Sequence, residues 1–142
     1  MLPQTHFLVS IVLFIIFYPF FGPATLWILA GGVLIDIDHP SLYIFRFKKF
    51  RLKEMFNYFE NNKKLMVGLF VFHNVEFLFL MIVLSFFYQA AFWFTVGLFA
   101  HYLCDWLSEF RKGGTFLKPY SFFYWLKIRK AYKREAGKNE HA

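Results

Sequence analysis

Histidines and carboxylates interrupt the two long apolar stretches of this 142-residue chain. Imidazole and carboxylate side chains are ligands that zinc, manganese and iron accept. In an apolar membrane segment each such group costs a few kcal/mol to insert unless a partner offsets the cost. A bound divalent metal is the simplest such partner. The predicted ligands are His6, Asp36, Asp38, His39, His73, Glu76, His101 and Asp105.

Two pairs among these residues have the spacing of neighbours on one helix face. His101 and Asp105 are four residues apart, and His73 and Glu76 are three apart, so each pair can point in one direction from a helix. Such pairs on facing helices build the di-metal sites of helical bundles. The set is also larger than the three protein ligands of a catalytic zinc. We therefore expect one or two divalent metals, zinc first, with manganese or iron as alternatives.

The segment from Asp36 to His39 ends the first apolar stretch. Asp36 and His39 can face the same side of a last helical turn, whereas Asp38 points elsewhere unless the chain is extended there. The following Pro40 favours an extended exit, because a residue before proline avoids helical geometry. One carboxylate can thus ligate while the other orients an imidazole. In hydrolysis, Asp38 or Glu76 is predicted to take the proton of a metal-bound water.

The charge of the chain is divided by position. All sixteen lysines and arginines lie in two blocks, seven within residues 46–64 and nine within 111–138. The positive-inside rule places both blocks on the cytoplasmic side of a membrane, so an even number of crossings separates them. Residues 65–110 are long enough for two crossings. The single cysteine, Cys104, excludes an internal disulfide and a thiolate-rich zinc site.

The first apolar run, residues 7–35, allows two interpretations. Proline and glycine interrupt its centre between residues 19 and 23, which suits either one kinked helix or a hairpin of two short helices, about 2–18 and 24–38. We favour the hairpin, because it returns His6 to the side of the other predicted ligands. A kinked helix would separate them by the membrane thickness. The leader lacks the basic region of a signal peptide, so we expect this run to stay in the mature protein.

These patterns predict an all-α fold, a multi-pass membrane helical bundle that forms a single domain, residues 1–142. Its parts are a first hairpin (1–40), a basic segment (41–64), a second hairpin (65–110) and a basic tail (111–142). The second hairpin is expected to contain helices Leu65–Phe87 and Ala91–Leu107. The basic, aromatic segments are expected to lie on anionic lipid head groups as interfacial helices, and the tail to fray into a disordered end. Membrane lipids are therefore the predicted partners, and no nucleic acid is expected.

The ligand pattern resembles the YdjM-like family. The resemblance rests on Gly32-Val33-Leu34-Ile35-Asp36-Ile37-Asp38-His39, an early and a mid-chain histidine, and H-x-x-x-D on a late membrane helix, and it covers about residues 1–110. Members are described as inner-membrane-associated, metal-dependent hydrolases, some of them LexA-binding. Their ligand logic is similar to that of zinc phospholipase C and the single-strand nucleases, which implies phosphoester hydrolysis. Many members carry an H-R-G-x-T-H-S-like segment where this chain reads His73-Asn74-Val75-Glu76.

The predicted function is that of a membrane-bound metal-dependent hydrolase. Its substrate would be a phosphoester, a lipid head group or a nucleotide-like compound, at the cytoplasmic face of the inner membrane. Two alternatives stay open, a metal-binding regulatory or scaffold protein and a metal-ion transporter. A transporter needs polar residues that lead to the outer face. The outer halves of the predicted helices are apolar apart from Thr25, Ser85, Gln89 and Thr95, which disfavours transport.

Overall fold

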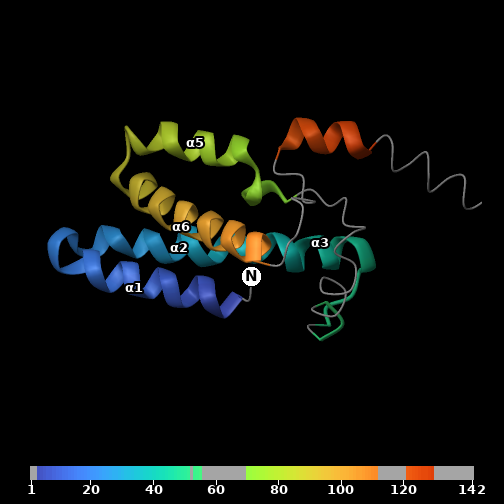
Figure 1. The fold of residues 1–142 in the computed structure, drawn as a ribbon, viewed down its shortest axis with the longest axis horizontal. Coiled ribbons are helices and arrows are strands. Elements are labelled where there is room, and N and C mark those ends of the chain that lie inside the picture. The colour runs from blue at the N-terminus through green and yellow to red at the C-terminus, as the bar shows by residue number, and fades with distance from the viewer. Residues whose placement is uncertain (1–2, 52, 56–69, 112–120, 130–142) are drawn as a thin grey trace, which may run out of the picture.

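The computed structural model describes residues 3–51, 53–55, 70–111 and 121–129, and these ranges contain helices and no β-strand (Figure 1). The all-α class is therefore confirmed. The elements are, in chain order, α1 Pro3–Phe21, the 3-10 helix η1 Gly22–Leu26, α2 Trp27–Val33, the 3-10 helix η2 Leu34–Ile37, α3 Asp38–Phe47, the 3-10 helix η3 Val71–His73, α5 Val75–Ser85 and α6 Gln89–Arg111. Residues 122–129 form a further short helix.

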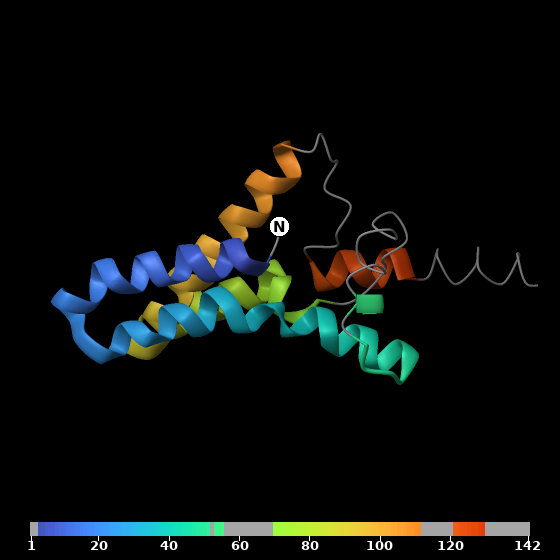
Figure 2. The same ribbon diagram turned by 90° about the horizontal axis from the view of Figure 1, so that it is seen from below.

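α1 and α2 form the first hairpin and lie side by side (Figures 1 and 2). The turn begins at Gly22, whose φ of 67° lies in the left-handed region that glycine adopts without a side-chain clash. Pro23 follows at the start of η1, where its fixed φ and missing N–H are tolerated. The Thr25 hydroxyl donates to Gly22 O at 2.7 Å and closes the turn. The chain thus folds as the hairpin and not as one kinked helix.

The helical path continues from α2 through η2 into α3, so the segment from Asp36 to His39 has no extended exit. The prediction of an extended backbone before Pro40 is therefore wrong. Pro40 is the third residue of α3. Proline has no N–H, and this is tolerated there because the N–H groups of the first helical turn make no hydrogen bond within the helix. α3 ends at Phe47, where Lys48 adopts the left-handed conformation of a C-cap.

α5 and α6 form the second hairpin and pack against each other. The prediction of one unbroken helix Leu65–Phe87 is wrong, because Asn74 is extended, with φ −91° and ψ 146°, and α5 starts only after it. The 11 residues of α5 span about 16 Å, roughly half of a hydrocarbon core. α6 has 23 residues, which span about 34 Å, and it extends beyond both ends of the predicted Ala91–Leu107.

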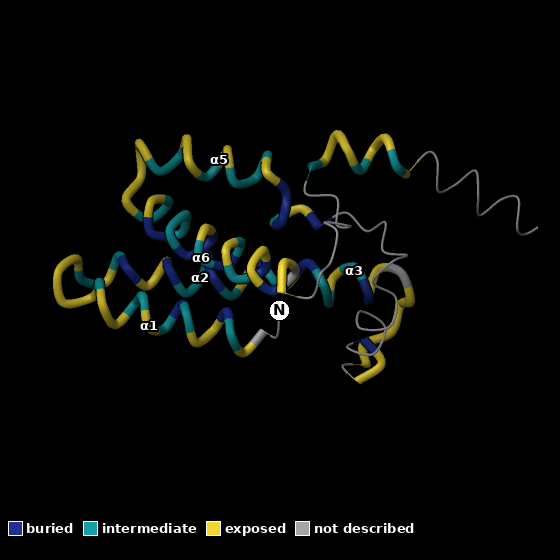
Figure 3. Tube along the Cα trace, viewed as in Figure 1, coloured by how far each residue is buried: buried dark blue, intermediate teal, exposed yellow. Residues whose placement is uncertain are grey.

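Glycines bring α2 and α6 into backbone contact at the centre of the bundle. A Cβ atom on Gly97 would lie 2.1 Å from Ile28 O, and one on Gly31 would lie 2.0 Å from Phe94 O. Neither position accepts a larger residue unless the helices move apart. Ile28 and Leu98 are fully buried beside this contact, and Figure 3 shows buried positions in both helices. Close approach through small residues is a common way for helices to associate in membranes.

Both hairpin turns lie at one end of the bundle, whereas α3 and residues 122–129 lie at the other (Figures 1 and 2). Beyond α3, Arg51 donates to Glu54 at 2.6 Å, and this hydrogen bond lowers the pKa of the exposed Glu54 carboxyl. Residues 52, 56–64, 112–120 and 130–142 of the two predicted basic segments lie outside the described residues, as do residues 65–69 of the second predicted hairpin.

Among the described residues, one continuous helical stretch, Gln4–Phe45, is long and apolar enough to cross a membrane by length and composition. It includes α2 and most of α1 and α3, and it reverses direction at the turn that begins at Gly22, so it is a hairpin that continues into α3. Val75–Ser85 is a shorter apolar helix.

Candidate metal centre

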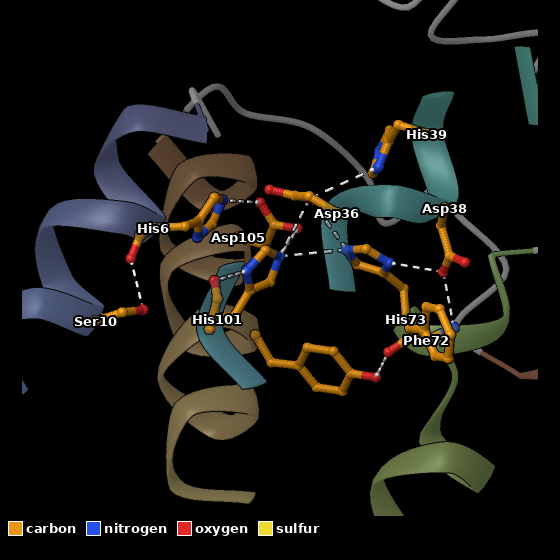
Figure 4. Close-up of polar contacts among 11 residues, drawn as sticks. His6, Ser10, Asp36, Asp38, His39, Phe72, His73, His101 and Asp105 are labelled. Atoms are coloured by element: carbon orange, nitrogen blue, oxygen red, sulfur yellow. Dashed lines mark hydrogen bonds and ion pairs between the residues drawn. The ribbon is translucent and has the colours of Figure 1, made fainter. Parts of the chain in front are cut away.

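Three side chains from separate elements point at one another near the start of α3 (Figure 4). They are Asp36 from η2, His73 from η3 and His101 from α6. His73 Nε2 lies 3.2 Å from His101 Nε2, and Asp36 Oδ1 lies 3.6 Å from each of these nitrogens. Tetrahedral metal–ligand bonds of about 2.0–2.2 Å place the ligand atoms about 3.3–3.6 Å apart. This triangle of ligand atoms therefore has the dimensions of three ligands around one metal.

The outer nitrogens of both imidazoles face acceptors of the protein. His101 Nδ1 lies 2.8 Å from Gly32 O, and His73 Nδ1 lies 3.3 Å from Asp38 Oδ2. Because a carbonyl and a carboxylate accept hydrogen bonds, a hydrogen on each Nδ1 satisfies both contacts, and a ring that is neutral with this tautomer presents a lone pair at Nε2. Two lone pairs and a carboxylate oxygen thus face one point. A cation at that point suits this donor set, and held outer nitrogens are typical of metal-binding histidines.

Asp38 supports His73 from outside the triangle. Its Oδ2 also accepts the N–H of Phe72 at 2.7 Å, and its side chain is largely buried. Tyr102 holds the same turn, because its hydroxyl lies 2.6 Å from Phe72 O and 3.1 Å from Asn74 O. Asp38 is therefore placed to orient an imidazole, as expected for one of the two carboxylates. Its roles as ligand and as proton acceptor stay predictions.

His39 and Asp105 lie on opposite sides of the triangle. His39 Nδ1 lies 3.6 Å from Asp36 Oδ1, and Asp105 Oδ2 lies 3.7 Å from His101 Nε2. Ligand atoms of Asp36, His39 and His73 lie within 4.8 Å of one another, as do those of His73, His101 and Asp105. These two groups share His73, and a third group of the same kind joins His6 to Asp36 and His101. Together the three groups offer enough donors for one or two metals.

His6 reaches the other predicted ligands from the start of α1. We call the set of His6, Asp36, Asp38, His39, His73, His101 and Asp105 the cluster. Its Nε2 lies 3.3 Å from Asp105 Oδ1, and its ring stacks on that of His101 with centroids 3.8 Å apart. The Ser10 hydroxyl donates to His6 O at 2.7 Å. His6 Nδ1 is buried and has no hydrogen-bond partner among the described residues. The first hairpin thus brings His6 to the other predicted ligands, although its part in metal binding stays a prediction.

The cluster is closed toward the bundle and open on one side. His73 and His101 are 4% and 2% exposed, whereas the side chains of Asp36 and His39 are 25% and 23% exposed. The solvent-facing side of the cluster is therefore the side of Asp36 and His39.

A family model described as YdjM inner membrane protein matches residues 1–134. The chain belongs to this family. No curated protein and no solved structure matches the chain. The family match covers the whole cluster and extends beyond the motif-based resemblance, which ends at about residue 110, into the basic tail.

In this YdjM-family chain, Glu76 is the predicted ligand that the structure does not bring to the others. Its Oε1 accepts the Ser121 hydroxyl at 2.6 Å, and both carboxylate oxygens lie 3.1 Å from the N–H of Phe122. The expected common face with His73 does not form, because Asn74 is extended and His73 lies before the helix. Glu76 instead connects the first turn of α5 to the start of helix 122–129.

Sequence reasoning missed two residues that hold the imidazoles. Gly32 supplies the carbonyl for His101, and Gly31-Gly32 in an apolar run is a signal of close helix approach that could have found it. Tyr102 holds the turn that carries His73, and no pattern in the sequence distinguishes it from the seven other tyrosines.

Proposed function

We propose that this YdjM-family protein is a metal-dependent hydrolase of phosphoesters, embedded in the inner membrane with its metal centre near the cytoplasmic face. The observation that carries the proposal is the triangle of Asp36, His73 and His101. Its three donor atoms face one point, and both outer imidazole nitrogens are held by the protein.

Asp36, His73 and His101 would hold the first metal. Asp105 with His6, or His39 on the open side, would complete its coordination or hold a second metal. When bound, such a cation lowers the pKa of a coordinated water to about 7 and polarises a phosphoryl oxygen. Asp38 would keep the His73 ring in place, and Asp36 and His39, whose side chains are 25% and 23% exposed, would form the side from which a substrate enters.

The distribution of polar and apolar side chains supports a bundle that crosses the membrane more than once. On α1 the fully buried side chains, His6 and Ser10, are polar, whereas large apolar residues such as Leu8 and Ile15 are more than half exposed. α5 and α6 likewise expose Phe79 and Phe99. Exposed apolar faces of this extent mark contact with a membrane, and buried polar groups mark its functional interior.

The depth of the cluster supports a phosphoester substrate. The cluster lies where the apolar bundle meets α3 and the basic residues that follow α3, which the positive-inside rule assigns to the cytoplasm. Lipid phosphates lie at this level of a bilayer. Lysine and arginine at this end of the bundle would attract an anionic substrate.

Metal analysis of the purified protein tests the site. We expect the wild-type protein to retain a divalent metal, and His101→Ala to lose it, because His101 contributes one corner of the triangle and contacts Asp36. His141→Ala removes a histidine outside the predicted set and serves as the control. Equal and negligible metal in all three proteins would overturn the proposal.

A screen of phospholipids and nucleotide esters then tests the activity. We expect the metal-loaded protein to release phosphate or an alcohol from at least one phosphoester, and His101→Ala to be inactive. A protein that retains its metal yet hydrolyses none of these esters would contradict the hydrolase and favour a scaffold role for the metal.

A further inference from the structure

The second hairpin contains a backbone break that carries a predicted ligand. η3 ends at His73, and Asn74 is extended before α5 begins. Backbone N–H and C=O groups at such a break have no partners within a helix. In a membrane protein they need other partners within the protein, because lipid offers none. The position of His73 therefore depends on the side chains that hold residues 71–74.

Side chains of α3 and α6 bond both backbone polar groups of Phe72, the residue before His73. Asp38 of α3 accepts the Phe72 N–H at 2.7 Å, and the same carboxylate oxygen lies 3.3 Å from His73 Nδ1 (Figure 4). Tyr102 of α6 donates its hydroxyl hydrogen to Phe72 O at 2.6 Å. Asn74 O lies 3.1 Å from the same hydroxyl oxygen. The turn that carries His73 is thus held from two sides.

Tyr102 also contacts His73 through its ring. The two rings are nearly parallel, with an interplanar angle of 22° and centroids 6.2 Å apart. Tyr102 directly follows His101 in α6, so neighbouring residues of one helix supply one predicted ligand and hold the turn of another. The Nε2 atoms of His73 and His101 are 3.2 Å apart, and α6 contributes to both sides of this distance.

We propose that Tyr102 is a positioning residue of the metal centre, which holds His73 at the distance from His101 that one metal requires. The inference rests on the proposed function, because it concerns the same site. Tyr102 is not itself a ligand, since its hydroxyl hydrogen is directed at backbone carbonyls. The affinity of the centre for a divalent metal thus depends on a hydroxyl that lies outside the triangle.

Nitrogen NMR of the histidine rings tests the positioning in the metal-free, full-length protein. The signals are assigned by replacing each histidine in turn. In the wild type we expect the hydrogen of His73 on Nδ1, facing Asp38, and in Tyr102→Phe a mixture of both tautomers. His101 should keep its hydrogen on Nδ1 in both proteins, because Gly32 O lies 2.8 Å from that nitrogen.

Zinc affinity, measured by competition with a fluorescent chelator, is the second test. We expect it to fall about 10-fold in Tyr102→Phe, at the lower end of the range for outer partners of metal-binding histidines. Tyr88→Phe is the matched control, because it removes the hydroxyl of an exposed tyrosine between α5 and α6, and it should keep wild-type affinity.

Replacing Tyr102 with 4-aminophenylalanine provides a graded variant. Its amino group reaches the same carbonyls and donates a weaker hydrogen bond than the hydroxyl. We expect a zinc affinity between those of the wild type and Tyr102→Phe. This variant takes the place of Tyr102→Phe in both measurements if Tyr102→Phe does not fold.

The outcomes separate this inference from the hydrolase. Zinc binding by the wild type with unchanged affinity in Tyr102→Phe would overturn the inference alone. So would an unchanged His73 tautomer, or equal changes at His73 and His101, which would indicate a general loosening of the fold. If the wild type binds no zinc, the proposed function fails, whereas a tautomer change confined to His73 would still support Tyr102 as the residue that holds it.

Discussion

His73 and His101 each use one ring nitrogen for the protein and direct the other at a shared point. This division fixes the orientation of both rings before any ligand arrives, because a rotated ring would lose its bond to Asp38 or to Gly32. A ligand that binds there does not have to order the side chains first. Such preorganisation strengthens metal binding and is typical of functional sites built on helices.

Replacing Asp38 with asparagine tests this orientation. Asp38→Asn keeps the shape of the side chain but removes the charge that faces His73 Nδ1–H, and one amide orientation places a donor against that donor. We expect the affinity for divalent metal to fall about 10- to 100-fold, as with other outer partners of metal-binding histidines. Competition with a chromophoric chelator measures the change.

Glu54→Gln is the control for Asp38→Asn, because it makes the same chemical change at an exposed carboxylate that contacts Arg51. Its metal affinity should match that of the wild type. If Asp38→Asn also keeps wild-type affinity, Asp38 does not orient His73.

Helical spacing predicted the relation between His101 and Asp105 and between Asp36 and His39, because these pairs do lie in continuous helical stretches. The same argument failed for His73 and Glu76. Asn74 is the N-cap of α5, and asparagine before an apolar run is a helix-start signal that the spacing argument ignored. One extended residue is enough to rotate the following helix away from the preceding side chain. Local spacing thus predicts pairs only where the backbone has no break.

At the scale of elements, the contact between α2 and α6 determines where His101 lies. Gly97 and Gly31 allow the backbones to approach, and Gly32 on the same helix supplies the carbonyl that holds the His101 ring. A Cβ atom on Gly32 would lie 2.0 Å from Ser10 Oγ of α1, so all three helices meet here. The packing of the bundle and the geometry of the cluster are therefore coupled.

Gly97→Leu should separate α2 from α6 and disturb the cluster. Its Cβ would overlap Ile28 O, and overpacking of this kind costs about 1–3 kcal/mol. We expect a lower unfolding temperature and a loss of bound metal, since the His101 bond to Gly32 depends on the same contact. Thermal unfolding and metal content are measured on the same sample.

Gly22→Ala is the comparison for Gly97→Leu. Its Cβ would meet nothing, but φ of 67° costs an alanine about 1–2 kcal/mol. Stability should fall while metal content stays at the wild-type level, because Gly22 is at the opposite end of the bundle. Full metal retention by folded Gly97→Leu would show that packing and cluster are independent.

Glu76→Gln tests whether Glu76 holds the start of helix 122–129 against α5 or binds metal. The amide loses the charge that accepts the Ser121 hydroxyl and the Phe122 N–H at a helix N-terminus. We expect faster hydrogen exchange in residues 121–129 and unchanged metal content. Loss of metal without a change in exchange would instead restore Glu76 as a ligand. Glu54→Gln again serves as the control for both measurements.

The first hairpin could be predicted because proline and glycine at residues 19–23 mark its turn, and because only a hairpin brings His6 to the side of the other predicted ligands. The length of α5 could not be predicted. Hydropathy is equally high on both sides of Asn74, so an apolar average does not reveal a helix start.

At the scale of the whole molecule, one end of the bundle is apolar and the other end is basic. The two hairpin turns form an apolar end with exposed Phe20 and Phe86, whereas the basic residues after α3 and those of helix 122–129 lie at the other end. The cluster lies between these ends. A membrane would orient such a molecule by its basic end, because lysine and arginine near membrane segments stay in the cytoplasm.

Cysteine labelling in intact cells tests this orientation. In a Cys104→Ser background, which leaves no other cysteine, we introduce Phe87→Cys at the second turn and Lys49→Cys after α3, both at exposed positions. A maleimide that cannot cross the inner membrane should label Phe87→Cys and leave Lys49→Cys unlabelled until the cells are opened. Opened cells control for reactivity.

The short α5 makes this result informative. Because its helix is only about 16 Å long, a crossing requires local thinning of the bilayer or a contribution from the flanking residues. A Phe87→Cys that stays unlabelled in intact and in opened cells and reacts only in detergent would mean that the second hairpin enters the membrane without crossing it. Labelling of Lys49→Cys from outside would reverse the proposed orientation and place the metal centre at the outer face.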